Sequence, residues 1–108
     1  MSVEQPSVVD FISVHPESGV VTLTISDHLA WDSDQEEHVE LLQRKIENYL
    51  NFVESGEVYT AYPSAEGRRI QIVVAGRFPL SDFGKTFFQY ASTFTSEAQI
   101  ELSFREIS

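Results

Sequence analysis

The sequence predicts a two-layer α+β fold: a four-stranded mixed sheet with two helices on one face, in the order ββαβαβ. Three observations lead to this prediction. Residues 34–55 and 83–96 each carry one apolar stripe at helical spacing. Four short segments elsewhere alternate apolar with polar residues, as strands buried on one face do. A chain of 108 residues has room for one core, so we expect a single domain over residues 1–108.

The first part of the chain reads as a hairpin. Residues 1–7 contain Pro6 and small polar residues, and we expect a flexible segment there. Strands are expected over residues 9–14 and 20–26, joined by a turn with Gly19 in the left-handed conformation. In the second strand, apolar residues alternate with Thr and Ser, so one face should be buried and the other polar.

The helix predicted over residues 34–55 is the longest expected element. Asp32 with Gln35, or Ser33 with Glu36, has the spacing of a capping box, and Gly56 should end the helix in the left-handed conformation. The apolar stripe consists of Val39, Leu42, Ile46, Tyr49, Leu50 and Val53. The residues expected to face water are His38, Glu40, Gln43, Lys45, Glu47 and Glu54.

The segment after this helix is expected to be a loop over residues 57–68. Its aromatic residues, Tyr59 and Tyr62, should cover the end of the helix. A third strand is predicted over residues 70–75, because its apolar residues alternate.

The second helix, over residues 83–96, has weak intrinsic propensity because it contains Gly84 and several Thr residues. Ser81 is its expected N-cap. Its buried stripe should consist of Phe83, Phe87, Phe88, Ala91 and Phe94. A fourth strand follows over residues 100–107. If both crossovers are right-handed, the last three strands are parallel and the first is antiparallel to the second. Strand orders 1-2-3-4 and 2-1-3-4 both satisfy this.

The composition limits the functions that are open to the chain. It has 17 acidic and 7 basic residues, a formal net charge of −10, and its few bases do not form the cluster that nucleic-acid binding needs. Cysteine is absent, which excludes disulfides and thiolate chemistry. No apolar run reaches the ~20 residues of a membrane span, and residues 1–8 do not resemble a signal peptide. We therefore expect a cytoplasmic protein that binds neither nucleic acid nor membrane.

The acidic residues are concentrated before and within the start of the first helix. No base occurs among them until Arg44. One interpretation is a solvated helix start that suits the helix dipole. The other is a contact surface for a basic partner. In the second interpretation Trp31 is the aromatic anchor, and the surface consists of Asp27, His28, Trp31, Asp32, Asp34, Glu36, Glu37 and Glu40.

The same region carries a family resemblance. Its motifs are Asp27-His28-Leu29 with Trp31-Asp32, then Glu54-Ser55-Gly56, Tyr59 and Tyr62-Pro63. In these motifs the chain resembles a family of small bacterial proteins whose function is not assigned. The resemblance implies a small bacterial cytoplasmic domain. It supplies no catalytic residue.

The sequence contains candidate residues for three kinds of small-molecule site. Asp34 and His38, with His28, Asp27 and Asp32 upstream, could hold a metal, but the spacing matches no known motif, and we expect no metal and no other cofactor. His28 or His38 beside a carboxylate could act as a general base. Tyr59 and Tyr62 could line a pocket, or, like Trp31, simply close an end of the helix.

The sheet face opposite the helices is a further candidate surface for self-association or for a partner. Its expected residues are Thr22, Thr24, Gln71, Val73, Ala75, Glu101, Ser103 and Arg105, with Val9 and Phe11 if Ile12 and Val14 point inward. Monomer and homodimer both remain open.

The function we expect is therefore non-enzymatic: a protein–protein interaction module, which could be of the immunity or antitoxin type. The alternative is a small-ligand or metal-assisted enzyme centred on His28, Asp32 and His38. Binding through charge would weaken with salt, whereas a metal site would raise thermal stability when zinc or manganese is added.

Overall fold

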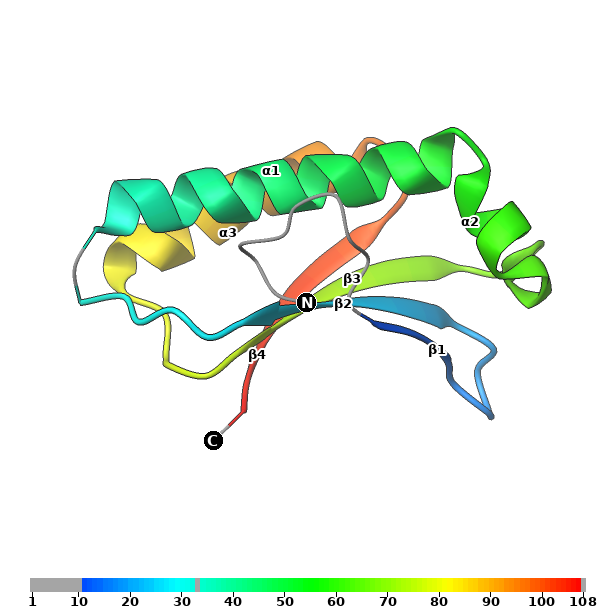
Figure 1. Ribbon diagram of the computed structural model, residues 1–108, viewed down its shortest axis with the longest axis horizontal. Coiled ribbons are helices and arrows are strands. Elements are labelled where there is room, and N and C mark those ends of the chain that lie inside the picture. Colours follow the sequence, from blue (N-terminus) through cyan, green and yellow to red (C-terminus); the bar gives the residue numbers. More distant parts are fainter. Residues whose placement is uncertain (1–10, 33, 108) are drawn as a thin grey trace.

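The computed structural model describes residues 11–32 and 34–107 and has the predicted α+β architecture (Figure 1). Its elements, in order, are β1 (Phe11–Val14), β2 (Val21–Asp27), α1 (Gln35–Glu54), α2 (Glu57–Ala61), a 3₁₀ turn η1 (Pro63–Ala65), β3 (Ile70–Gly76), α3 (Asp82–Ser96) and β4 (Glu101–Glu106). The predictions for residues 1–7, for Val9 and for a cap at Ser33 lie outside the described residues.

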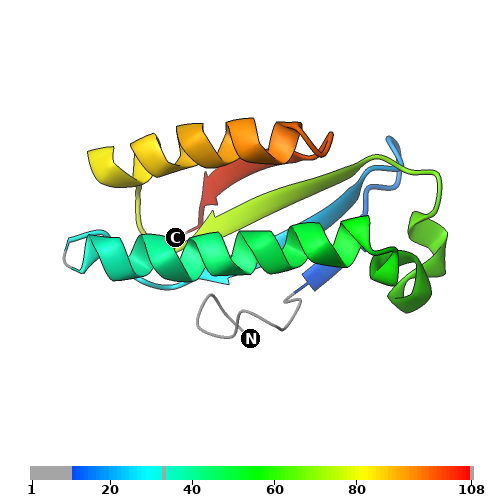
Figure 2. The same cartoon turned by 90° about the horizontal axis from the view of Figure 1, so that it is seen from above.

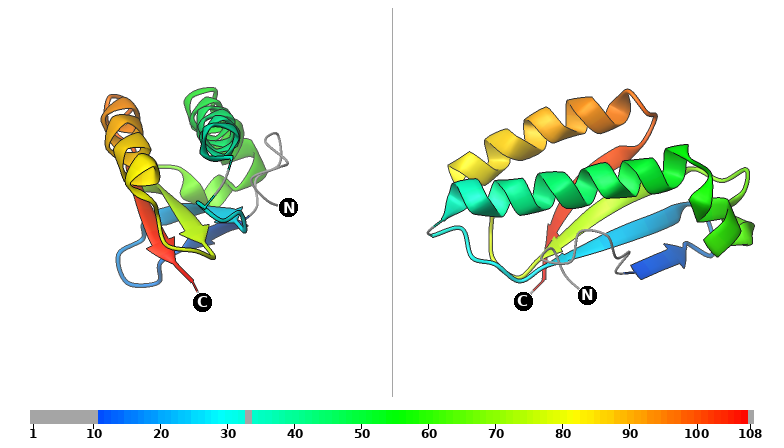
Figure 3. Two further views of the ribbon diagram at one scale, coloured as in Figure 1. Left: turned by 90° about the vertical axis from the view of Figure 1, so that its left-hand side faces the viewer. Right: turned by 45° about the horizontal axis from the view of Figure 1, so that its top comes forward.

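The sheet has the order β1-β2-β3-β4, which is one of the two orders that the sequence allows. Strand β1 is antiparallel to β2, and β2, β3 and β4 are parallel to one another. Helices α1 and α3 lie on the same face of the sheet (Figures 1 and 3) and run side by side in the same direction (Figure 2). Each connects two parallel strands, so strands β2 and β3 end where α1 and α3 begin. We call this edge of the molecule the helix-start end.

The core lies between the sheet and the helices. Val21, Leu23 and Ile25 of β2 are fully buried, whereas Thr22 and Thr24 between them are only partly buried. Leu23 lies beside Ile72, which in turn lies beside Leu102 on β4. Each such side chain contributes about 1.5–3 kcal/mol when it is fully buried. The buried apolar side chains, which alternate along the strands as predicted, therefore hold the sheet against the helical layer.

The start of α1 differs from the prediction. Asp34 occupies the N-cap with a left-handed φ of 51°, and its side chain makes no capping hydrogen bond. The predicted capping box of Asp32 with Gln35 is therefore wrong. The Gln35 side chain has another partner, since its Oε1 accepts a hydrogen bond from the Ser81 hydroxyl at the start of α3. At the other end of α1, Gly56 has a φ of 85° and ends the helix as predicted.

The buried face of α1 is wider than predicted. Leu42, Ile46 and Tyr49 are buried as expected. Lys45 and His38, which were expected to face water, are 0% and 2% exposed, so both predictions are wrong. The aliphatic stem of Lys45 packs like an apolar side chain, but its buried ammonium needs compensating contacts. Its ammonium lies 5.7 Å from the centroid of the Tyr49 ring, within the range of a cation–π interaction.

The segment between α1 and β3 is more ordered than the predicted loop. It contains α2 and η1, with Val58 and Ala65 fully buried. Tyr59 and Tyr62 pack partly buried against the core, as expected. These short helices close the far end of the helical layer, opposite the helix-start end (Figure 1).

Helix α3 is capped as predicted, because the Ser81 hydroxyl accepts a hydrogen bond from the Gly84 N–H at 3.1 Å. Its buried face is narrower than expected. Phe87 and Phe88 are buried, but Phe83 and Phe94 are 45% and 47% exposed, so their assignment to the core is wrong. One face of α3 is enough to cover β3 and β4. Phe83 and Phe94 lie on a second face, which has no sheet beneath it, and therefore stay exposed.

The sheet face opposite the helices has the predicted pattern. Ile12 pairs with Leu23 and points toward the helices, whereas Phe11 pairs with Thr24 on the opposite face and is 60% exposed. Ala75 is the exception in the predicted open face, because it is buried.

Candidate functional site

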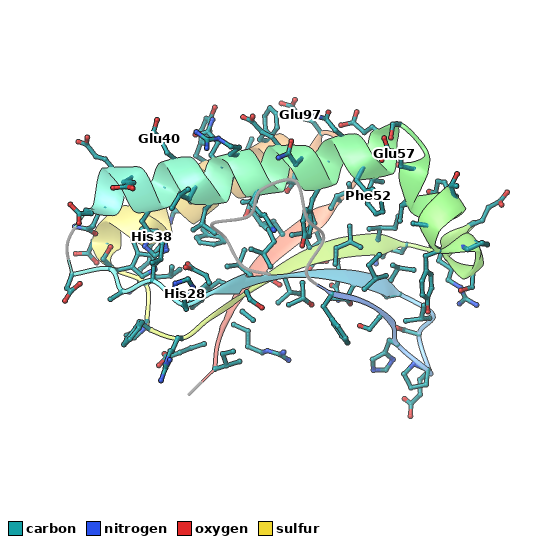
Figure 4. The ribbon with its side chains drawn as sticks, in the orientation of Figure 1. His28, His38, Glu40, Phe52, Glu57 and Glu97 are labelled. Atoms are coloured by element: carbon teal, nitrogen blue, oxygen red, sulfur yellow. The ribbon has the colours of Figure 1, made fainter. Side chains whose placement is uncertain are left out.

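A buried pair of titratable residues lies at the helix-start end. Asp27 is the last residue of β2, and His38 lies in the second turn of α1. The Asp27 Oδ2 is 2.6 Å from the His38 Nε2, and its Oδ1 accepts the Leu29 N–H at 3.1 Å. Figure 4 shows His38 on the sheet side of α1 and Glu40 on the opposite side. The pair joins the end of β2 to the helix that follows it.

Trp31 covers this pair. Its ring stacks on the His38 ring with 3.7 Å between centroids and 24° between planes, and only 6% of the residue is exposed. Gly84 of α3 also packs closely on the indole, since a Cβ at that position would lie 3.3 Å from Trp31 carbons. Trp31 thus fills the space between the starts of α1 and α3. As a buried residue, it offers little surface as the predicted anchor for a partner.

The chemistry open to His38 follows from its two ring nitrogens. Asp27 Oδ1 accepts the Leu29 N–H, and Oδ2 shares a hydrogen bond with His38 Nε2, in which an ionised carboxylate can only accept from an Nε2–H. The other nitrogen, Nδ1, is buried and has no hydrogen-bond partner among the described residues. An imidazole oriented by a carboxylate is the arrangement of many general bases. Here, however, the nitrogen that would accept a proton is enclosed by protein, so the geometry favours a role in holding the fold.

The residues of the predicted enzyme site do not converge on one hollow. His28 and Asp27 line a hollow of about 340 Å³ with Arg77, while Asp32 and His38 line another of about 260 Å³ with Asp34, Glu37 and Leu41. Within residues 11–32 and 34–107, no three His, Asp or Glu side chains are arranged to hold a metal ion. Catalysis at this end remains an untested prediction.

The acidic segment remains at the surface, with two exceptions. Asp27 and Trp31 are buried, and His28 is exposed on the side of the other hollow. The exposed carboxylates form what we call the acidic cluster: Asp32, Asp34, Glu36, Glu37 and Glu40. Most of them border a hollow of about 600 Å³, which Phe83 of α3 completes. The structure therefore places an exposed aromatic ring beside the cluster.

Phe83 is the first of a row of aromatic residues along α3. The sequence prediction placed Phe83, Phe87 and Phe94 of this row in the core and did not include Tyr90. Tyr90 is 65% exposed and follows Phe83 and Phe87 along α3, with Phe94 one turn beyond. The signal was present in the sequence: α3 carries more aromatic residues than one apolar stripe can hold. More aromatic residues than one stripe can hold indicate that some of them lie on a second face of the helix, away from the core.

The other predicted pocket lies at the far end of the molecule. Tyr59 lines an open hollow of about 790 Å³ together with Val53, Arg68 and Arg69, whereas Tyr62 does not line it. Arg68 is used structurally there, since it donates to the carbonyl oxygens of Ser64 and Gly19. Trp31 lies at the opposite end of α1, so the two sets of aromatic residues form separate regions.

Comparison with known proteins gives one result. No curated protein and no solved structure matches the chain. No helix in the described part of the chain is long and apolar enough to cross a membrane. One family matches over residues 1–108, and it is described as a family of unknown function, DUF6572. Since the match covers the whole sequence, the chain belongs to DUF6572, which confirms the expected family of unknown function.

Proposed function

We propose that this protein is an interaction module that binds a basic protein through the acidic cluster. The single observation that carries the proposal is the position of the cluster: its carboxylates are exposed and lie beside the exposed ring of Phe83. Protein-binding surfaces are enriched in aromatic residues and have a polar, solvent-accessible rim.

Helix capping does not account for the cluster. Asp34 occupies the N-cap, yet its side chain makes no capping hydrogen bond. Glu36 and Glu37 lie in the first turn, where the helix dipole favours acids, but Glu40 lies beyond that turn. Contact with a positively charged partner would use all of these carboxylates together.

The overall charge supports the same proposal. A formal net charge of −10 on 108 residues attracts a basic partner over about a Debye length, ~10 Å at 0.1 M salt. Such attraction raises association rates and repels acidic competitors. One form of the proposal is an immunity or antitoxin role in the bacterial cytoplasm, in which this protein covers a basic partner and blocks its action.

The test compares two triple charge reversals. In the first, Glu36, Glu37 and Glu40 are changed to Lys. In the matched control, Glu54, Glu57 and Glu66 are changed to Lys; these residues are also exposed and lie toward the other end of the helical layer. Both variants change the net charge by the same amount, so only the position of the charge differs.

A partner captured from the source cell should bind the native protein and the control but not the first variant. Its binding should fall steeply between about 0.05 and 0.3 M salt. Circular dichroism should give the same helix content for all three proteins. Equal loss of the partner in both variants, or its retention by the first variant, would reject the acidic cluster as the contact surface.

A further inference from the structure

The acidic cluster lies at one end of the surface along which α1 and α3 run side by side (Figure 2). The α1 wall presents residues spaced by four, three and four positions, and the α3 wall presents residues with the same spacing. The α1 wall consists of Glu36, Glu40, Gln43 and Glu47, and the α3 wall consists of Phe83, Phe87, Tyr90 and Phe94. Because the helices run in the same direction (Figure 2), the two rows lie along each other. We call this feature the helix groove.

Two separate hollows are lined by residues of both helices, one of about 600 Å³ near the helix starts and a much smaller one of about 40 Å³ further along. Glu36 and Glu40 face Phe83 across the first, and Glu47 faces Tyr90 and Phe94 across the second. Each row covers about 16 Å, since a helix rises 1.5 Å per residue. This is the length of three helical turns, so a short helix of a partner could contact both walls along its whole length.

The two walls differ in chemistry. The α3 wall is aromatic: Phe83, Tyr90 and Phe94 are exposed, whereas Phe87 between them is buried. The α1 wall is acidic, with Gln43 donating to Glu47 at 3.2 Å. An occupant must therefore be apolar on one side and cationic on the other. Neither hollow is lined by a Lys or Arg side chain, so a second copy of this groove cannot supply the positive charge.

We infer that the helix groove binds an amphipathic helix of the partner, with its apolar side on the α3 aromatics and its Lys or Arg side on the α1 glutamates. A helix fits because its own backbone hydrogen bonds are satisfied. An added β-strand would need a free sheet edge, and both walls of the groove are helices. This inference rests on the proposed function and names the class of partner.

The experiment uses a synthetic peptide of about 18 residues, with Leu on one helical side and Lys on the other. One control peptide has the same composition in an order that forms no apolar side, and a second has Glu in place of Lys. Binding is measured by fluorescence anisotropy of the labelled peptide, and the site is mapped by amide chemical shifts of the protein. The protein variants are Tyr90→Ser with Phe94→Ser, and Phe11→Ser as a control on the opposite sheet face, where Phe11 is equally exposed.

The amphipathic basic peptide should bind in the micromolar range and shift amides of both α1 and α3. Its affinity should fall at least about tenfold with the Tyr90 and Phe94 substitutions, as for central aromatic contacts, and stay unchanged with Phe11→Ser. The reordered peptide and the Glu peptide should each bind at least about tenfold more weakly.

Failure of this inference can be told apart from failure of the proposed function. If the reordered basic peptide binds equally well and shifts only α1 amides, the helix inference is overturned, but the acidic contact surface stands. If the Glu peptide binds as well as the Lys peptide, charge selection is overturned. Absence of binding by the amphipathic peptide overturns the inference, while the charge-reversal capture independently decides the proposed function.

Discussion

The most informative prediction concerns the buried Asp27–His38 pair. Asp27→Ala removes a carboxylate that accepts two hydrogen bonds, one from His38 Nε2 at 2.6 Å and one from the Leu29 N–H at 3.1 Å. His38 stays buried under Trp31, and with its Nδ1 already lacking a partner among the described residues, both ring nitrogens would then be unsatisfied.

The magnitude follows from these lost partners. A buried polar group without a partner costs about 1–3 kcal/mol, and the lost bond to Leu29 costs about 1 kcal/mol more. We therefore expect Asp27→Ala to lower the free energy of unfolding by about 3 kcal/mol. This is a large part of the ~5–15 kcal/mol that stabilises a domain. The double variant Asp27→Ala/His38→Leu removes both polar groups, and should cost about 2 kcal/mol less than the sum of the single changes.

The assay is urea unfolding followed by far-ultraviolet circular dichroism. Fluorescence is unsuitable here, because the single Trp residue stacks on His38 and would respond to the substitution itself. Asp32→Ala is the matched control: it removes an exposed carboxylate from the same segment, and should change stability by less than about 0.5 kcal/mol. If Asp27→Ala costs no more than Asp32→Ala, or if the two single changes are additive, the pair does not hold this end of the fold.

The remaining predictions concern α3. Gly84→Ala would ordinarily stabilise a helix by about 1 kcal/mol; here its Cβ would press on the buried Trp31 ring at 3.3 Å, so we expect a net loss of about 1 kcal/mol, and a rise in melting temperature would contradict this packing. Ser81→Ala should cost about 1 kcal/mol through loss of the N-cap, which urea titration would measure. Phe87→Ala should cost about 3 kcal/mol, whereas Tyr90→Ser should cost less than about 0.5 kcal/mol. Equal costs at these last two positions would show that Tyr90, like Phe87, packs in the core.

Several features follow from local physics, and the sequence by itself predicts them. Alternation in Val21–Asp27 defines a strand with one buried face. Gly19 and Gly56 take the left-handed conformation that few other residues adopt. The Ser81 hydroxyl caps the helix that begins one residue later. Each of these depends on residues within a turn or two along the chain, so spacing alone is enough to identify them.

The tertiary structure decides which side of each helix is covered, and the site depends on that. His38 is buried because Asp27, eleven residues earlier, supplies the carboxylate that its ring needs, and a side chain's partner across a loop cannot be read from helical spacing. Phe83 and Phe94 are exposed for the converse reason: the sheet beneath α3 fills only one of its faces. The sequence predicted the two long helices, α1 and α3, but not the short helix α2 between α1 and β3. Only the packing of α1 beside α3 decided that glutamates of one helix and aromatic residues of the other would line the same hollows.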